Sequence, residues 1–232
     1  MSRLFNGTSD VITFAAGGSA NLPVGAFSIG MLMRLNSNHR GGLVDTYDAG
    51  GFRQLGLNPF DNGSLFLSCN GTTSTAYSGY INVWAALWLT RPSAGGTVRS
   101  HLYRYDTLSW THADLAALGA RSAVSSIKVG SFDSGQWLNA NMAVMAFKMA
   151  DLTDLTLENS GLVTNLNGWS SLSPSTLWAF NQANATDPVL DLAGGGATQT
   201  ASTNPAVSAV EPPGFTYSTP SNATGLFLPF FT

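Results

Sequence analysis

The sequence predicts an all-β protein in which two antiparallel sheets pack face to face, followed by an extended C-terminal arm. Apolar side chains alternate with polar or small ones in residues 27–35 and 98–105, which is the two-residue period of a strand with one buried face. Residues 82–89 and 142–149 are apolar on both sides, as in strands at the centre of a sandwich. Together these patterns favour a sandwich over a helical or mixed fold.

Turn sequences separate the predicted strands. Segments 48–51, 61–63 and 70–71 combine Asp or Asn with Gly, the composition of tight hairpin connections. Strands that recur about every ten residues with turns between them are typical of sandwiches. Helical signals are confined to residues 151–158 and to a turn or two after Ser173-Pro174, where an N-cap residue precedes proline. We therefore expect less than about a tenth of the chain in α-helix.

The composition excludes several classes of partner. Charged residues make up 10% of the chain, against about 25% in an average soluble domain. The net charge is −3 and the basic residues are scattered, so nucleic-acid binding is not expected. A weakly charged surface of Ser, Thr, Asn and Gly favours large shared interfaces, as in extracellular or virion proteins. The single cysteine, Cys69, excludes an intrachain disulfide and is expected in the core.

No targeting or membrane segment is expected. The N-terminal residues 1–7 contain no apolar run of the kind that secretion signals have. No apolar stretch approaches the ~18 residues of a membrane-spanning helix. Asn6, Asn62, Asn70, Asn184 and Asn222 each begin an Asn-x-Ser/Thr triplet, and without a secretion signal we interpret all five as turn residues.

The composition changes near Leu166, which suggests the organisation of the chain. Beyond this residue come stretches rich in Gly, Pro, Ser and Thr, such as 194–196 and 212–214. We place the sandwich at residues 1–165 and an extended arm with an apolar tail at residues 166–232.

The apolar tail is a candidate assembly element. Its large apolar side chains are Leu226, Phe227, Leu228, Phe230 and Phe231. Full burial of each is worth about 1.5–3 kcal/mol, and Pro229 prevents a helix. The tail can cover a groove on its own sandwich or bind a neighbouring subunit. We favour the neighbour, and therefore a homo-oligomer.

Three segments resemble laminin G-like jelly rolls, which belong to the concanavalin A-like sandwiches. Residues 4–12, which begin Leu-Phe-Asn-Gly, are similar to that family's opening hairpin. Residues 27–33 are similar to its "F-T-I-x-x-W" strand, and 127–131 with 137–143 are similar to its "I-G…I-d-e-V" region. The sequence departs from the family at Ala140, where Gly is usual, and at Ala143 and Val144, which replace its acidic pair. The resemblance covers residues 1–160 and implies a jelly roll.

The chain also resembles virion proteins of tailed bacteriophages in its general style, including the Pro-Pro-Gly-Phe sequence near its C-terminus. That resemblance implies a non-catalytic structural subunit, a minor tail protein or a capsid decoration protein. Its partners would be other virion proteins, with host-surface glycan as a further ligand, and its location would be the virion, assembled in the host cytoplasm. The alternative is a free lectin-like carbohydrate-binding module, and a less favoured one is a degenerate glycoside hydrolase.

Catalytic constellations are not apparent in the sequence. Glycoside hydrolysis needs two carboxylates facing one bond, yet the only glutamates are Glu158 and Glu211, on a predicted helix and in a proline-rich turn. The histidines 39, 101 and 112 fit no metal-binding spacing, and His101 is expected to be a satisfied residue of a sheet. We therefore predict no enzyme activity, no catalytic residue and no cofactor.

Aromatic and acidic residues on predicted loops form a candidate glycan site. Aromatic faces give apolar contact to a sugar, and planar polar groups fix its orientation. The candidates are Tyr103, Tyr105, Asp106 and Trp110 in one region, with Asp133 and Trp137 in another loop. Most of the six tryptophans are expected in the core, Trp84 and Trp88 above all.

Calcium is a further alternative because laminin G-like modules often bind it at one rim. The candidate ligands are Asp45, Asp48, Asp106 and Asp133. We favour turn capping for these carboxylates.

Overall fold

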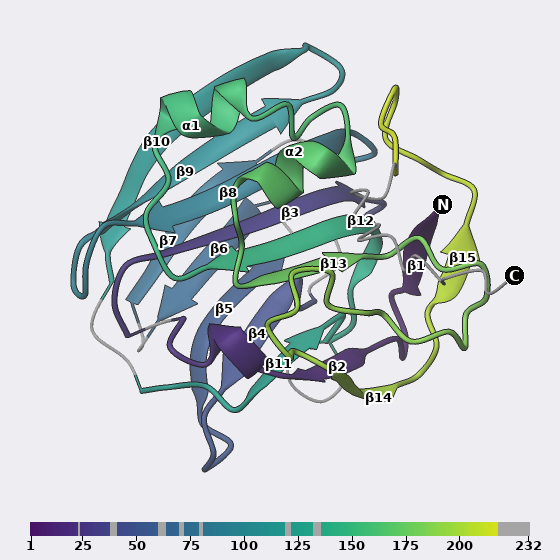
Figure 1. Ribbon diagram of the computed structural model, residues 1–232, viewed down its shortest axis with the longest axis horizontal. Helices are drawn as coiled ribbons and strands as arrows, with labels where there is room; N and C mark the ends of the chain where they lie inside the picture. The colour runs from purple at the N-terminus through teal and green to yellow at the C-terminus, as the bar shows by residue number, and fades with distance from the viewer. Residues whose placement is uncertain are drawn as a thin grey trace, which may run out of the picture.

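The computed structural model is a sandwich of two antiparallel sheets (Figure 1). It describes residues 1–22, 24–37, 41–59, 64–69, 72–78, 81–118, 122–131 and 136–217. Strands hold 46% of these residues and helices 8%, which confirms the all-β prediction and the low helix content. No helix among them has the length and apolar character needed to cross a membrane.

The first sheet has eight strands. Their order is β10-β9-β8-β3-β12-β1-β15, and β13 pairs with the second half of β12. The bounds are β1 Ser2–Asn6, β3 Phe27–Leu35, β8 Trp84–Arg91, β9 Thr97–Arg104, β10 Ser109–Ala117, β12 Asn139–Lys148, β13 Thr176–Ala179 and β15 Ala206–Ser208. The two strands predicted to be apolar on both sides, β8 and β12, flank β3 at the centre of this sheet.

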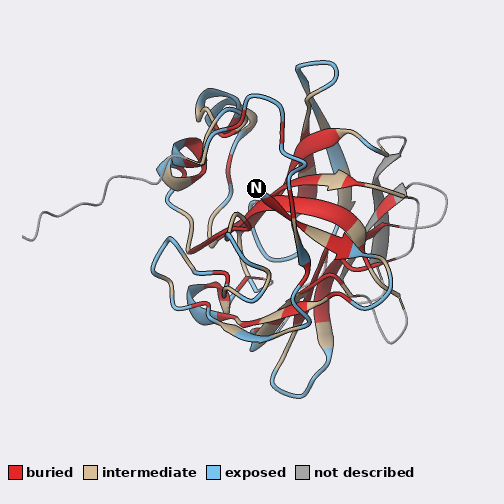
Figure 2. Ribbon diagram, turned by 90° about the vertical axis from the view of Figure 1, so that its right-hand side faces the viewer, coloured by how far each residue is buried: buried red, intermediate tan, exposed pale blue. Residues whose placement is uncertain are grey.

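The second sheet has seven strands in the order β14-β2-β11-β4-β5-β6-β7. The bounds are β2 Ile12–Ala15, β4 Val44–Tyr47, β5 Arg53–Pro59, β6 Ser64–Cys69, β7 Thr72–Ser78, β11 Ser126–Val129 and β14 Gln199–Ser202. The short 3-10 helix η1, Gly17–Ser19, follows β2. Figure 2 shows buried residues running along the strands of both layers.

Residues 166–217 are part of the sandwich. The expected arm supplies β13 and β15 to the first sheet and β14 to the second. A buried guanidinium helps to hold this segment, because Arg3 on β1 donates hydrogen bonds to carbonyl oxygens of Ala185, Pro205, Asn184 and Asp187 at 2.6–3.0 Å. The rest of the predicted arm, residues 218–232, lies outside the described residues.

The main core lies between the two sheets. Inward side chains of both layers meet there, and the rings of Phe14 and Trp178 stack with their centroids 3.7 Å apart. The helical turn expected after Ser173-Pro174 is absent, since residues 176–179 form β13 instead. Pairing with β12 decides the outcome, because it buries Trp178 in the main core and Leu177 on the opposite side of the sheet.

A second core covers the outer side of the first sheet. Helices α1 (Asp154–Asn159) and α2 (Leu166–Ser171) lie over that side (Figure 1). Trp169 of α2 is fully buried and stacks on Trp88 of β8 with ring centroids 5.1 Å apart. A Cβ on Gly30 of β3 would lie 2.2 Å from the Trp88 ring, so only glycine leaves room for this tryptophan. The two cores explain why β8 and β12 are apolar on both sides.

Candidate functional site

The outer side of β9 and β10 carries the candidate site. Strand alternation sends Val98 and Leu102 into the main core, so Arg99, His101 and Tyr103 at the alternate positions point to the outer side of the sheet. The hairpin register then sets three cross-strand pairs side by side: Arg99 with Asp114, His101 with His112, and Tyr103 with Trp110. The face therefore changes from charged at one end to aromatic at the other.

Arg99 holds two carboxylates at the charged end. Its Nε and Nη2 donate to both carboxylate oxygens of Asp154 on α1, at 2.8 and 2.7 Å, and its Nη1 donates to Asp114 at 2.7 Å. These hydrogen bonds raise the pKa of Arg99, and the Arg99 hydrogen bond lowers the pKa of Asp154 to about 2. At neutral pH both groups are therefore charged.

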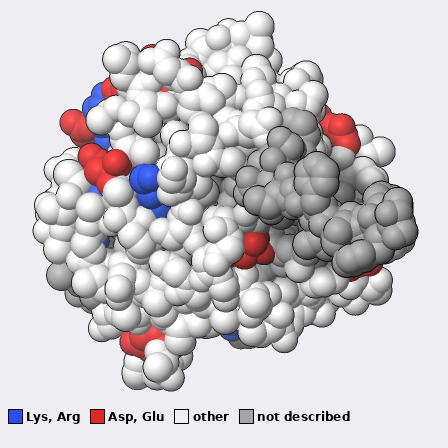
Figure 3. Space-filling view, viewed as in Figure 1, with Lys and Arg blue, Asp and Glu red and all other residues white. Residues whose placement is uncertain are grey.

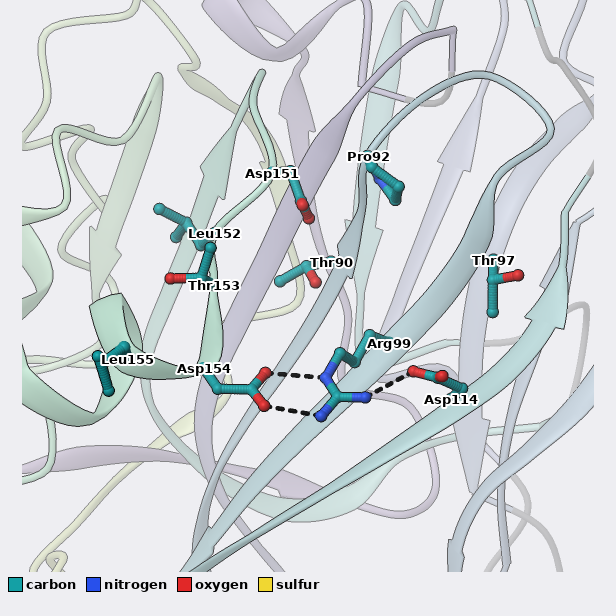
Figure 4. Close-up of a pocket in the computed structure, with 10 residues that line it drawn as sticks. All are labelled: Thr90, Pro92, Thr97, Arg99, Asp114, Asp151, Leu152, Thr153, Asp154 and Leu155. Atoms are coloured by element: carbon teal, nitrogen blue, oxygen red, sulfur yellow. Dashed lines mark hydrogen bonds and ion pairs between the residues drawn. The ribbon is translucent and has the colours of Figure 1, made fainter.

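A groove of about 550 Å³ opens beside this ion-pair cluster (Figure 4), within the range of about 300–1,000 Å³ of small-molecule sites. Its walls combine hydroxyl, charged and apolar groups. They are Thr90, Pro92, Thr97, Arg99, Asp114, Asp151, Leu152, Thr153, Asp154 and Leu155. Figure 3 shows charged side chains gathered near α1 on a surface that is otherwise largely uncharged.

Two histidines lie in the middle of the face. His101 is fully buried, and its Nε2 is 3.0 Å from Thr90 Oγ1, so it is the satisfied sheet residue that the sequence predicts. Burial lowers its pKa to about 4, and it is therefore neutral at pH 7. His112 reaches Glu158 of α1 through Nε2, at 2.7 Å. The two histidines and Asp154 each offer one ligand atom within 4.8 Å of the others.

The aromatic end gathers most of the predicted glycan-site residues. The ring of Tyr103 lies 5.2 Å from that of Tyr105 and 5.4 Å from that of Trp110, between centroids. Tyr105 has a structural role, since its hydroxyl donates to the Val163 carbonyl at 2.6 Å and its burial raises its pKa. Asp106 is exposed and pairs with its neighbour Arg104.

Tyr105 and Asp106 also line a small notch of about 180 Å³ at this end, together with Asn82, Val83, Trp84 and Pro213. The groove beside Arg99 is about three times larger. Trp84 and Trp88 are buried, as predicted.

The other predicted site residues lie elsewhere. Trp137 forms an isolated antiparallel bridge with Ser131 and does not lie on β9 or β10. Asp133 and the predicted assembly residues Leu226, Phe227, Leu228, Phe230 and Phe231 lie outside the described residues.

The candidate calcium ligands that the structure describes have protein partners. Asp45 pairs with Arg53 at 3.0 Å, and Asp106 pairs with Arg104. Asp48 accepts hydrogen bonds from the backbone N–H groups of Gly50 and Phe52, which is the turn-capping role that the sequence favours.

Sequence reasoning missed the Arg99 cluster and its groove. The sequence could have indicated the contact between Arg99 and Asp114, because a hairpin that turns at residues 105–108 places these two residues opposite each other. The same hairpin places His101 opposite His112. Asp154 gave no such signal, since it reaches Arg99 only through the packing of α1 on the sheet.

Comparisons with known proteins bear on the fold. The sequence matches no protein-family model and no curated protein. A putative carbohydrate binding protein from Bacteroides ovatus is similar in structure over 90% of this chain and 61% of its own, with 12% identity and a TM-score of 0.55. The heptameric SAP-like pentraxin of Limulus polyphemus matches 66% of this chain and 77% of its own, with 14% identity and a TM-score of 0.47. Domains LG4-5 of mouse laminin α1 match 63% of this chain and 40% of their own, with 17% identity and a TM-score of 0.44.

The chain therefore is a jelly-roll sandwich of the concanavalin A-like class. This rests on its own two sheets and on the Bacteroides protein, whose TM-score is above 0.5. The chain spans 61% of the length of that protein, and at 12% identity the two share a fold alone. The virion role inferred from the sequence stays a prediction.

Proposed function

We propose that the chain is a non-catalytic, lectin-like carbohydrate-binding module whose ligand occupies the groove beside Arg99. The observation that carries this proposal is a groove of about 550 Å³ in which one guanidinium fixes two carboxylates. The putative carbohydrate binding protein from Bacteroides ovatus, which shares the fold, supports the same class of ligand.

The groove offers the groups that sugar recognition needs. A sugar presents hydroxyls at its ring edges and C–H groups on its faces, so it needs fixed polar groups beside apolar surface. Asp114 and Asp154 supply acceptors, Thr97 supplies a hydroxyl, and Leu155 is an apolar side chain that is 65% exposed. Because Arg99 already holds both carboxylates, a ligand that binds them loses less free energy to side-chain ordering.

The hydrogen bonds from Arg99 to Asp114 and Asp154 also argue against hydrolysis. A glycosidase needs one protonated carboxyl group that can act as general acid. Asp154 has a pKa of about 2, because Arg99 donates hydrogen bonds to it, and it is therefore ionised at neutral pH. Glu158 on the same helix lies within hydrogen-bond distance of His112. We accordingly expect the purified chain to release no reducing ends from the polysaccharides that it binds.

Glycan-array screening followed by calorimetry with the best oligosaccharide tests this function. Asp114→Asn removes one charged acceptor from the groove, and Asp106→Asn is the matched control, because each aspartate is exposed and pairs with an arginine of β9. A hydrogen bond to a charged group is worth about 1.5–3 kcal/mol, so Asp114→Asn should weaken binding by about tenfold or more, with Asp106→Asn close to wild type.

Two results contradict the proposal in different ways. If Asp106→Asn weakens binding and Asp114→Asn does not, the ligand occupies the notch beside Tyr105 and the assignment to the groove is wrong. If the wild-type chain binds no glycan on the array, the carbohydrate-binding function itself is wrong.

A further inference from the structure

We propose that His101, His112 and Asp154 bind a divalent transition-metal ion, and that Zn²⁺ fits this set best. The site shares Asp154 with the proposed carbohydrate groove, but its ligand is a metal ion and its test needs no carbohydrate. Its donors come from three elements, β9, β10 and α1, that the fold brings together on the outer side of the first sheet. Two imidazoles and one carboxylate match the ligands of catalytic-type zinc sites, which leave a fourth position for water.

The separations of the donor atoms fit a tetrahedral ion. His101 Nδ1 lies 3.0 Å from His112 Nδ1 and 3.1 Å from Asp154 Oδ1, and His112 Nδ1 lies 3.8 Å from the same oxygen. Ligands bound to Zn²⁺ at about 2.0–2.1 Å in tetrahedral geometry lie about 3.3–3.4 Å from one another. The three separations bracket that value, so small side-chain rotations suffice to seat the ion.

The remaining ring nitrogens of both histidines are held in place. His101 Nε2 is 3.0 Å from Thr90 Oγ1, and His112 Nε2 is 2.7 Å from a carboxylate oxygen of Glu158. Metal-binding histidines commonly use their second nitrogen in this way, because the contact fixes the ring orientation and the tautomer. With Nε2 protonated and donating to Glu158, His112 has a lone pair on Nδ1, where a metal would bind.

The local charge is suited to a dication. Asp114, Asp154 and Glu158 contribute three negative charges, and Arg99 contributes one positive charge. Counted without the histidines, these side chains therefore carry two net negative charges. Arg99 Nε lies 2.8 Å from Asp154 Oδ1, the same oxygen that would bind the ion. It opposes the ion electrostatically while it holds the carboxylate in position.

The competing explanation needs no metal. One proton shared between the two Nδ1 atoms would also account for their 3.0 Å separation. A Zn²⁺ titration separates the two explanations: a metal site binds one Zn²⁺ per chain, whereas a pair that serves only as a hydrogen bond shows no stoichiometric binding.

The experiment is a calorimetric titration of the full chain, freed of metal with EDTA and dialysed, with ZnCl₂ and separately with MgCl₂. We expect the titration to show one Zn²⁺ bound per chain and little Mg²⁺ binding. Zn²⁺ should also raise the melting temperature. Addition of CoCl₂ should give the visible absorption typical of four-coordinate Co²⁺. His112→Gln should abolish the stoichiometric binding and the Co²⁺ spectrum. Asp106→Asn, at the far end of the face, should leave both unchanged.

A second variant keeps the test decisive if His112→Gln does not fold. Glu158→Gln retains all three ligands and changes only the contact to His112 Nε2. Loss of such an outer contact costs about 10–100-fold in metal affinity, so this variant should still bind one Zn²⁺, but more weakly. Absence of stoichiometric Zn²⁺ binding to the wild-type chain overturns the proposal, and so does binding that neither variant weakens.

Discussion

Replacing Trp169 by Ala should destabilise the protein strongly, because it removes the largest side chain that α2 places in the second core. Trp169 is fully buried, stacks on Trp88, and donates a hydrogen bond through Nε1 to the Leu162 carbonyl at 2.7 Å. Removal of a buried tryptophan costs about 3–5 kcal/mol of unfolding free energy. At about 2–4 °C per kcal/mol for a chain of this size, the melting temperature should fall by roughly 6–20 °C.

Urea unfolding followed by tryptophan fluorescence and thermal unfolding followed by circular dichroism measure this effect. Trp110→Ala is the matched control, because Trp110 is only partly buried, on the face that we assign to function. It should cost about 1 kcal/mol. Equal losses in the two variants would refute the reasoning, because α2 would then not depend on a buried tryptophan for its place on the sheet.

Other perturbations test the packing and the titrating groups. Gly30→Ala places a Cβ 2.2 Å from the Trp88 ring and should destabilise the fold by about 1–3 kcal/mol in urea unfolding. Gly25→Ala, where a Cβ meets nothing within 4 Å, should stay within about 0.5 kcal/mol of wild type. For the metal-free chain, the lowered pKa of His101, about 4, means that the unfolded state binds the extra proton first as the pH falls below about 6.5. Unfolding free energy should therefore drop between pH 6.5 and 4, by up to about 3 kcal/mol from this group, and a stability that rises in urea titrations across that window would contradict the assignment. Asp154, with its pKa of about 2, stabilises the fold above pH 4 and should lose that contribution as the pH falls toward 2, an effect that Asp154→Asn should remove from acid-unfolding curves.

The fold could be predicted because strand alternation is a local signal. Residues 27–35 and 98–105 show the period directly, and both form strands. The apolar character of residues 82–89 and 142–149 indicated central strands. The sequence also predicted a helix at residues 151–158, where α1 forms, but it gave no signal for α2 and could not reveal that both helices cover the outer side of these strands.

The C-terminal segment shows where local signals end. β14 and β15 are four and three residues long, in a stretch rich in Ser, Thr and Ala. Their place is set by pairing with β2 and β1, at the opposite end of the chain, and by the carbonyl contacts of Arg3. Sequence composition described this segment as extended but could not tell a free arm from a strand.

The candidate site was predictable only where its residues are close together in the sequence. Tyr103 and Trp110 could be grouped because they lie on either side of one turn. The contact between Arg99 and Asp154 joins β9 to α1 across more than fifty residues, and depends on how the helix packs. The groove that this contact lines was therefore beyond sequence reasoning.

The central claim is that the outer side of β9 and β10, beside α1, is the functional face. A ¹⁵N–¹H NMR titration of the full chain with the best-binding oligosaccharide tests it most directly, because it maps the ligand without any substitution. We predict the largest amide shifts in residues 97–99, 113–115 and 152–155, which belong to or adjoin the groove lining. Shifts concentrated on the second sheet, in β4 and β5, with residues 97–99 unchanged, would contradict the account.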